Sequence, residues 1–405
     1  MTRTLDVLLV VSLATSALTA QSTHTVDAGG GGDFTEISAA VAAANAGDLL
    51  IVNAGNYNGF VLDKQLTIVG SHPDKPTVWG LTDIVSPAGA TLAGLSLTRV
   101  NVLGCADTLL FDEVVVTGGG STDCLTFKID DSLDVRLDGC VIYGKDGDFA
   151  CESVGIHIER SHVVITDSLV EGGDGWGDTF DGYDGRPGLD VAAGAHVDLA
   201  ATSVHGGTGG TPDVIISGMG GDGAPAIAIE ASATVILRGT NEHLIYGGPG
   251  GGGGFPGWSP PSVTGTGTLL WGGCVFFPAP SHTLDITLAD PSWPFTRLTG
   301  ESTPGGLLRV HAYGPPGVSQ LLVGSFFADK LDVHPVQGSL YLDPGSTFLM
   351  LPFQTISDDV GFNIVLPVPD LPTLLGLPIH LQSFGKDLGN HGKWLASNPM
   401  MAILR

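Results

Sequence analysis

Ionisable side chains recur at one position of a repeating strand pattern in the middle of the chain. Four segments of about 30 residues, a length typical of solenoid repeats, begin with short alternating runs at 125–129, 155–158, 188–191 and 226–229. Successive side chains of a strand point to opposite faces, so one residue of each run faces outward. The outward residues are Lys128, His157, Asp190 and Ala228.

If the four runs stack as neighbouring strands, Lys128, His157 and Asp190 lie a few ångströms apart. A carboxylate at that distance supports a charged histidine, and a nearby cation lowers the pKa of an aspartate. Such a row can bind a uronic acid or carry out acid–base chemistry. The alternative interpretation is a solvated ladder of polar side chains, which any solenoid has.

The loop that follows Gly173 holds a second set of candidate ligands. Carboxylates alternate with glycines in this loop, and Ca²⁺ prefers such oxygen ligands on a chain that turns sharply. The carboxylates are Asp174, Asp178, Asp181 and Asp184. We expect Ca²⁺ to bind here and expect no other cofactor. The alternative is a solvated acidic loop.

The same loop contains aromatic residues and one cation. Trp176 and Tyr183 offer flat apolar rings with a polar edge, which suits contact with sugar rings. Arg186 and Lys128 are the cations near the acidic loop that can serve as the base of a polysaccharide lyase. The sequence lacks a Gly-x-Ser-x-Gly elbow and a His-Glu-x-x-His motif, so these common hydrolase sites are not indicated.

The elements that must position these residues are three short strands per repeat. After the first run, each segment has a second alternating pair, such as Val163 and Ile165, and a third run that ends in glycine, such as 168–172. One coil of this kind cannot bury its apolar side chains alone, whereas stacked coils can. The pattern therefore predicts a β-solenoid. A helix is expected at 37–44, where apolar residues have helical spacing after a capping-box pattern at Asp33 and Glu36.

Composition and charge agree with many tight turns and limit the partners. The 405 residues include 61 Gly and 25 Pro, and the formal net charge is −26. Nucleic-acid binding needs clustered Lys and Arg, so this charge argues against a nucleic-acid partner and against an anionic membrane surface.

The first 20 residues predict an export signal. Arg3 precedes an apolar stretch that begins at Leu5, and Ala17 and Ala20 suit cleavage. That stretch is too short for a stable membrane span, so we expect no integral membrane segment in the mature protein. Export permits disulfides, with Cys124–Cys151 or Cys105–Cys124 feasible between adjacent coils; buried free thiols are the alternative.

The segment from Val26 to Gly70 resembles the opening of pectinesterases and other pectin-lyase-like proteins. The resemblance rests on 32–41 (Gly-Asp-Phe-Thr-Glu-Ile-Ser-Ala-Ala-Val), Ala46-Gly-Asp, 54–58 (Ala-Gly-Asn-Tyr-Asn) and 66–70 (Leu-Thr-Ile-Val-Gly). It implies a right-handed parallel β-helix with a short N-terminal capping helix. The paired catalytic aspartates of pectinesterases have no counterpart here, so the resemblance does not imply esterase activity.

Beyond the repeats, short strands between Gly and Pro turns predict a small antiparallel β-sandwich. The segments 366–382 and Ser397-Asn-Pro399 resemble C-terminal modules of exported planctomycete-type and myxobacterial proteins. The expected organisation is a signal peptide at 1–20, a β-helix at 21–248, a Gly/Pro-rich linker or loop at 249–265 and a C-terminal β-domain at 266–405.

These features together favour an exported, non-catalytic protein of the cell surface or matrix that binds extracellular polysaccharide, with Ca²⁺ as the expected ion. The competing hypothesis is a lyase or hydrolase acting on a uronate-containing glycan through Lys128, His157, Asp190 and Arg186. A fold of this type hosts both kinds of function, so the site has to decide between them.

Overall fold

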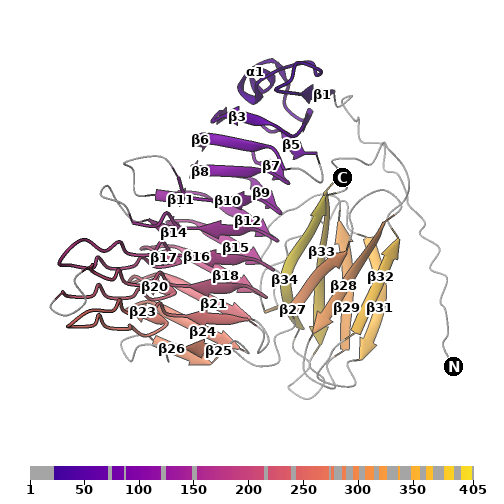
Figure 1. Cartoon of the computed structure of the whole chain (residues 1–405). Coiled ribbons are helices and arrows are strands. Elements are labelled where there is room, and N and C mark those ends of the chain that lie inside the picture. Colours follow the sequence, from indigo (N-terminus) through magenta and orange to yellow (C-terminus); the bar gives the residue numbers. More distant parts are fainter. Residues whose placement is uncertain are drawn as a thin grey trace.

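The chain forms a long stack of parallel coils with an antiparallel sandwich beside it (Figure 1). This computed structural model describes residues 22–71, 75–85, 88–119, 125–147, 153–213, 218–238, 243–272, 275–277, 285–288, 295–300, 306–313, 319–325, 336–337, 348–355, 362–367, 378–386 and 394–403. The expected export signal at 1–20 lies outside these residues. The coils form the right-handed parallel β-helix that the sequence predicted.

The helix α1 (Ile37–Ala43) caps the first coil, at the indigo end of the stack in Figure 1. It buries Ile37, Ala40 and Val41 against the first strands. The predicted capping box does not form. Glu36 is the N-cap residue and makes no side-chain cap bond, because the Asp33 carboxylate accepts hydrogen bonds from the Thr25 amide and hydroxyl instead.

Sheet A runs along one side of the coils, with parallel strands paired in chain order. Its members are β1 (Thr23–Val26), β2 (Leu49–Val52), β5 (Thr67–Gly70), β7 (Ala90–Ala93), β9 (Thr108–Asp112), β12 (Asp134–Asp138), β15 (His162–Thr166), β18 (His196–Ala200), β21 (Thr234–Arg238), β24 (Thr268–Gly272) and β26 (Asp285–Leu288).

Sheet B supplies the remaining parallel strands of the coils. Its members are β3 (Asn56–Asn58), β4 (Val61–Leu62), β6 (Thr77–Ile84), β8 (Ser96–Leu103), β10 (Val115–Val116), β11 (Leu125–Asp130), β13 (Val141–Tyr143), β14 (Val154–Glu159), β16 (Leu169–Glu171), β17 (Leu189–Val191), β19 (Ser203–His205), β20 (Ile227–Ile229), β22 (Leu244–Tyr246), β23 (Val263–Gly265) and β25 (Val275–Phe277).

The long strand β8 shows how the later coils are built. Its first residues, Ser96 and Leu97, pair with β10, and its last residues, Val100 to Leu103, pair with β11. The third strand of one predicted repeat and the first strand of the next therefore both belong to sheet B, and a loop separates them. From β10 to β23 each coil inserts its loop at this point, so the loops of successive coils leave the β-helix at the same place.

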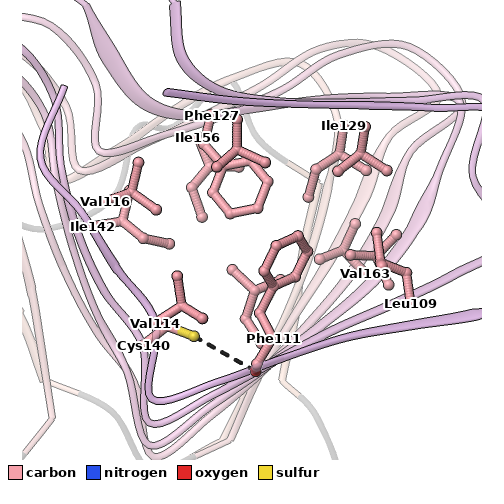
Figure 2. Close-up of a cluster of buried hydrophobic side chains, with 14 of the residues drawn as sticks. Leu109, Phe111, Val114, Val116, Phe127, Ile129, Cys140, Ile142, Ile156 and Val163 are labelled. Carbon is pink, nitrogen blue, oxygen red and sulfur yellow. Dashed lines mark hydrogen bonds between the residues drawn. The ribbon is translucent and has the colours of Figure 1, made fainter. Parts of the chain in front are cut away.

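The inward side chains of both sheets form one continuous core, part of which is shown in Figure 2. Phe111 and Phe127 pack edge to face with ring centroids 5.1 Å apart. The Cys140 thiol, a free cysteine, hydrogen bonds the Phe111 carbonyl at 3.6 Å, and burial raises its pKa, so it stays protonated. Cys105 is buried too. Cys124 and Cys151 lie outside the described residues, so the two disulfide pairings stay predictions.

The parallel ladder continues beyond the expected boundary at residue 248. Strand β23 pairs with β20, β25 pairs with β22, and β24 joins β21 to β26. The β-helix therefore extends to Leu288, and the expected linker at 249–265 is the loop and first strand of another coil. Strand β26 (Asp285–Leu288), which falls within the expected C-terminal β-domain, closes sheet A instead.

The antiparallel sandwich consists of two sheets. One contains β27 (Phe295–Gly300), β28 (Leu307–Tyr313) and β32 (Phe362–Pro367); the other contains β29 (Ser319–Ser325), β30 (Val336–Gln337), β31 (Phe348–Thr355), β33 (Pro378–Lys386) and β34 (Trp394–Ile403). Val310, Leu322 and Leu381 form a core between them.

The sandwich lies against the outer face of sheet A, where β34 packs on β9 and β15. This face is buried and charged. Arg136 pairs with Asp134 at 2.7 Å and Arg238 with Asp198 at 3.0 Å, with all four side chains nearly inaccessible to solvent. Such pairs hold a defined geometry because an unpaired partner would be a buried charge. Among the described residues, no helix is long and apolar enough to cross a membrane.

The register of β11 predicts opposite outcomes for two adjacent substitutions. Ile129 is fully buried, whereas Lys128 faces outward. Ile129→Asp would bury an unpaired charge, and we expect it to lower the free energy of unfolding by several kcal/mol, about 3 or more. Lys128→Gln should change it by about 0.5 kcal/mol or less. Urea denaturation of both variants tests this, and equal losses would contradict the register.

The buried side chain of His380 should make the stability of the sandwich sensitive to acid. Burial and the nearby Arg136 lower its pKa from 6.5 to about 3, and Asp134 opposes part of this shift. The unfolded chain therefore binds a proton that the folded chain excludes. The free energy of unfolding should fall by about 1.4 kcal/mol per pH unit as the pH drops from 6.5 toward 3.

The matched variant is His380→Leu, which removes the titrating group. The difference in free energy of unfolding between the wild type and this variant, measured by urea denaturation, should change with pH across that window. A difference that is constant with pH would contradict the prediction.

Candidate functional site

The outward row on sheet B has the register that the sequence predicted. Lys128 pairs with His157, His157 with Asp190, and Asp190 with Ala228 on successive strands. His157 Nδ1 lies 2.8 Å from Asp190 Oδ2, with both side chains partly exposed. A carboxylate bonded to one ring nitrogen fixes the orientation of the imidazole and leaves Nε2 for a ligand.

The cationic side chains beside this row form ion pairs with acidic side chains. Lys128 Nζ lies 3.4 Å from Asp130. Arg160 bonds Asp130 and Asp131, each at 2.6 Å, and also contacts Glu159. The hydrogen bond from Arg160 lowers the pKa of Asp131. The edge of the row therefore presents more negative than positive charge.

A second outward row, which the sequence analysis missed, lies on the other half of sheet B. His205 Nδ1 is 3.0 Å from Glu171 Oε1, and its ring meets Tyr246 edge to face at 6.1 Å. Glu171 and His205 are in register on β16 and β19. The signal was present in the sequence, because each of these residues stands just before the glycine that ends its repeat. The two rows flank the point where the loops leave the coils.

The four aspartates of the acidic loop do not converge on one point. Asp174 Oδ1 accepts the Thr208 amide, and Asp184 Oδ1 accepts the Asp222 amide, both at 2.7 Å. The amides of Asp181 and Phe180 bond Asp178 and lower its pKa. Among the described residues no group of three or more His, Cys, Asp or Glu side chains is placed to hold a metal. Calcium binding at Asp174, Asp178, Asp181 and Asp184 stays a prediction.

Instead, the carboxylates of Asp174 and Asp184 tie successive loops together, and glycines allow the loops to touch. The loops after β16, β19 and β22 form a stack that extends beyond the coils (Figure 1). Gly175 N bonds Thr208 O, Gly210 N bonds Tyr183 O, and Gly251 N bonds Gly221 O, at 2.7, 2.8 and 2.8 Å. A Cβ atom on Gly207, Gly210 or Gly251 would overlap a carbonyl oxygen of the neighbouring loop.

The loop stack displays large apolar side chains to solvent. Trp176 and Tyr183 stack on each other at 5.9 Å and 21°, so the two rings expected to contact sugar form one platform. Met219 is bridged to Phe255 in the next loop and to Asp181 in the preceding one. The exposed side chains are Phe180, Tyr183, Met219, Phe255 and Trp258. The sequence analysis missed Met219, Phe255 and Trp258, because loops 206–226 and 247–262 showed only glycine enrichment.

Arg186 stands at the base of the first loop of this stack. Its amide donates to Gly173 O and its carbonyl accepts from Gly207 N, both at 2.9 Å. Its backbone therefore joins two loops, and its side chain is exposed. The described contacts place His157 and Asp190 together, and they place Arg186 in the loop stack.

An open hollow of about 560 Å³ continues the first row beyond Asp190. Among its lining residues, Asp190, Glu230 and Thr266 have polar side chains, Ala193, Ala228 and Ala231 have small ones, and Gly265 has none. The volume is within the range of small-molecule sites. The row and the hollow together form an extended polar surface on sheet B.

No protein-family model matches the chain, and no curated protein matches it. Among solved structures, two forms of tailspike protein 2 of bacteriophage CBA120 are similar. One is its enzymatically active domain and the other is the full-length protein, which is described as from an Escherichia coli O157:H7 bacteriophage.

Each of these structures is 11% identical to this chain, with a TM-score of 0.25. The alignments cover 87% and 95% of this chain and 57% and 65% of the tailspike chains, so this chain spans less than two thirds of their length. Similarity at this level carries no information about activity.

Two adjacent glycines test whether the loops depend on close packing. A Cβ on Gly251 would overlap the Gly210 carbonyl oxygen, whereas a Cβ on Gly252 would meet the Thr211 side chain at an ordinary 3.6 Å. We expect Gly251→Ala to separate the loops and to speed amide hydrogen exchange in 206–226 by about tenfold or more. Gly252→Ala is the control and should leave exchange unchanged. Equal exchange in the two variants would contradict the packing.

Proposed function

We propose that this chain is a non-catalytic polysaccharide-binding protein of the cell surface or extracellular matrix. The observation that carries the proposal is the set of exposed aromatic side chains held on the glycine-packed loop stack. Phe180, Phe255 and Trp258 are 66%, 67% and 61% exposed, although burial would stabilise each of them. Exposed apolar groups gathered in one region mark a binding surface.

Polysaccharide suits this surface for three reasons. Sugar rings have flat C–H faces that stack on aromatic rings, while their hydroxyls bond polar groups at the edge. The polar rows on sheet B repeat with the strand spacing of about 4.8 Å, which gives an extended track for a linear polymer. The loops are fixed to each other by backbone hydrogen bonds, so little conformational entropy is lost on binding.

An enzyme remains the second candidate because of the His157–Asp190 pair. A carboxylate 2.8 Å from Nδ1 is the arrangement by which an imidazole is oriented as a general base. Lys128, on the neighbouring strand, would supply the positive charge near a sugar carboxylate. The assay is release of reducing ends or unsaturated products from polygalacturonate, alginate and neutral glucans. Turnover that is lost in His157→Ala would favour the enzyme over the binding protein.

Two equally exposed tryptophans provide the test of the binding surface. Trp258, on the loop stack, is 61% exposed, and Trp79, on β6, is 59% exposed. We expect Trp258→Ala to weaken binding of the polysaccharide that the protein selects from a glycan panel by about tenfold, roughly 1.4 kcal/mol. Trp79→Ala should leave the affinity unchanged, as measured by calorimetry or affinity electrophoresis. Equal affinities of the two variants would argue against the loop stack as the site.

A further inference from the structure

The hollow beside Asp190 exists because large side chains are missing from the coils around it. Ala228 occupies the row position that holds His157 and Asp190 on preceding strands. Ala193, Ala231 and Gly265 line the same space. The resulting hollow has a volume of about 560 Å³, which is within the range of small-molecule sites and sufficient for one sugar unit of a longer chain.

The groups that a ligand would meet in this hollow are mainly carboxylate oxygens. Asp190 uses Oδ2 to bond His157, and Glu230 uses Oε2 to bond the Ala193 amide at 3.0 Å. These bonds hold the two side chains in place, and each carboxylate has a second oxygen. Thr266 adds one hydroxyl. None of the residues described as lining the hollow is a cation.

The electrostatic surroundings reinforce this preference. Lys128 and Arg160, the cations along the row, are engaged by Asp130 and Asp131. The formal net charge of the chain is −26. A polyuronate would therefore be repelled by the whole surface as well as by the hollow, whereas a cationic polymer would be attracted.

We propose that the hollow lined by Asp190, Glu230 and Thr266 binds the protonated amine of an amino sugar, so that the ligand is a glycan with free primary amines. This inference rests on the proposed polysaccharide binding and specifies its ligand class. An ammonium group donates several hydrogen bonds from one point charge. Two fixed carboxylates and a hydroxyl are suited to accept them, and carboxylate–ammonium bonds are stronger than neutral ones.

The experiment compares polymers that differ only at the amine. Glucosamine oligomers and fully N-acetylated oligomers of equal length are titrated into the full chain, with polygalacturonate as the anionic polymer. We expect the amine-bearing oligomer to bind at least about tenfold more tightly than the acetylated one. Raising the ionic strength toward about 0.15 M should reduce this difference, because salt screens the exposed Glu230. It should not abolish the difference, because Asp190 is partly buried and is screened less.

The double variant Asp190→Asn/Glu230→Gln removes both charges with little change of shape. It should weaken binding of the amine-bearing oligomer by about tenfold or more. The matched control, Asp63→Asn/Asp107→Asn, removes two exposed acids outside the hollow and should leave the affinity unchanged. Equal losses in the two variants would mean diffuse attraction to the net charge, and would overturn the inference.

The outcomes separate this inference from the proposed function. Equal binding of the amine-bearing and acetylated oligomers, or binding of polygalacturonate alone, would overturn the amino-sugar assignment and leave polysaccharide binding standing. Amine-dependent binding that survives the Asp190→Asn/Glu230→Gln change would place the site elsewhere and overturn the inference too. Failure to bind any member of the glycan panel would remove the proposed function itself.

Discussion

Each coil of this β-helix bonds its backbone to the coil before and the coil after, and it cannot bury its apolar side chains alone. The turns follow the same rule. Ser132 Oγ accepts the Cys105 amide of the preceding coil and donates to the Asp130 carbonyl of its own coil, and Ser161 repeats this one coil later. Because side chains at equivalent positions lie one strand spacing apart, any residue that recurs in the sequence becomes a row in space.

The loops extend that repetition beyond the sheets. Their described residues form isolated bridges, yet their backbones bond from loop to loop because glycine lets carbonyl oxygens approach closely. Two of the aspartates expected to bind calcium, Asp174 and Asp184, accept hydrogen bonds from amides of the next loop. A rigid stack results, and it can hold Phe255 and Trp258 in solvent without collapse onto the coils.

The sandwich packs on sheet A of the β-helix, so sheets A and B differ in the charged groups that they expose. Burial of Arg136 and Asp134 under β33 and β34 places the charges of sheet A in fixed pairs, out of reach of a polymer. Sheet B keeps its polar rows, and the loops leave the coils between its two halves. The surface proposed for polysaccharide binding therefore combines the first row, the hollow and the loop stack on one sheet.

Strand alternation is local and a repeated pattern aligns with itself, so the amino-acid sequence was sufficient to predict the coil register and the outward row. The register of Lys128, His157 and Asp190 was predicted correctly for this reason. Tertiary structure decided what depends on non-local contacts. Glu230 and Asp190, on neighbouring coils, line one hollow, the sandwich packs on β9 and β15 of sheet A, and the coils run on to Leu288 past a glycine-rich loop that resembled a linker. Composition cannot tell a loop that packs on its neighbours from one that connects domains, since glycine favours both and only the partner backbone distinguishes them.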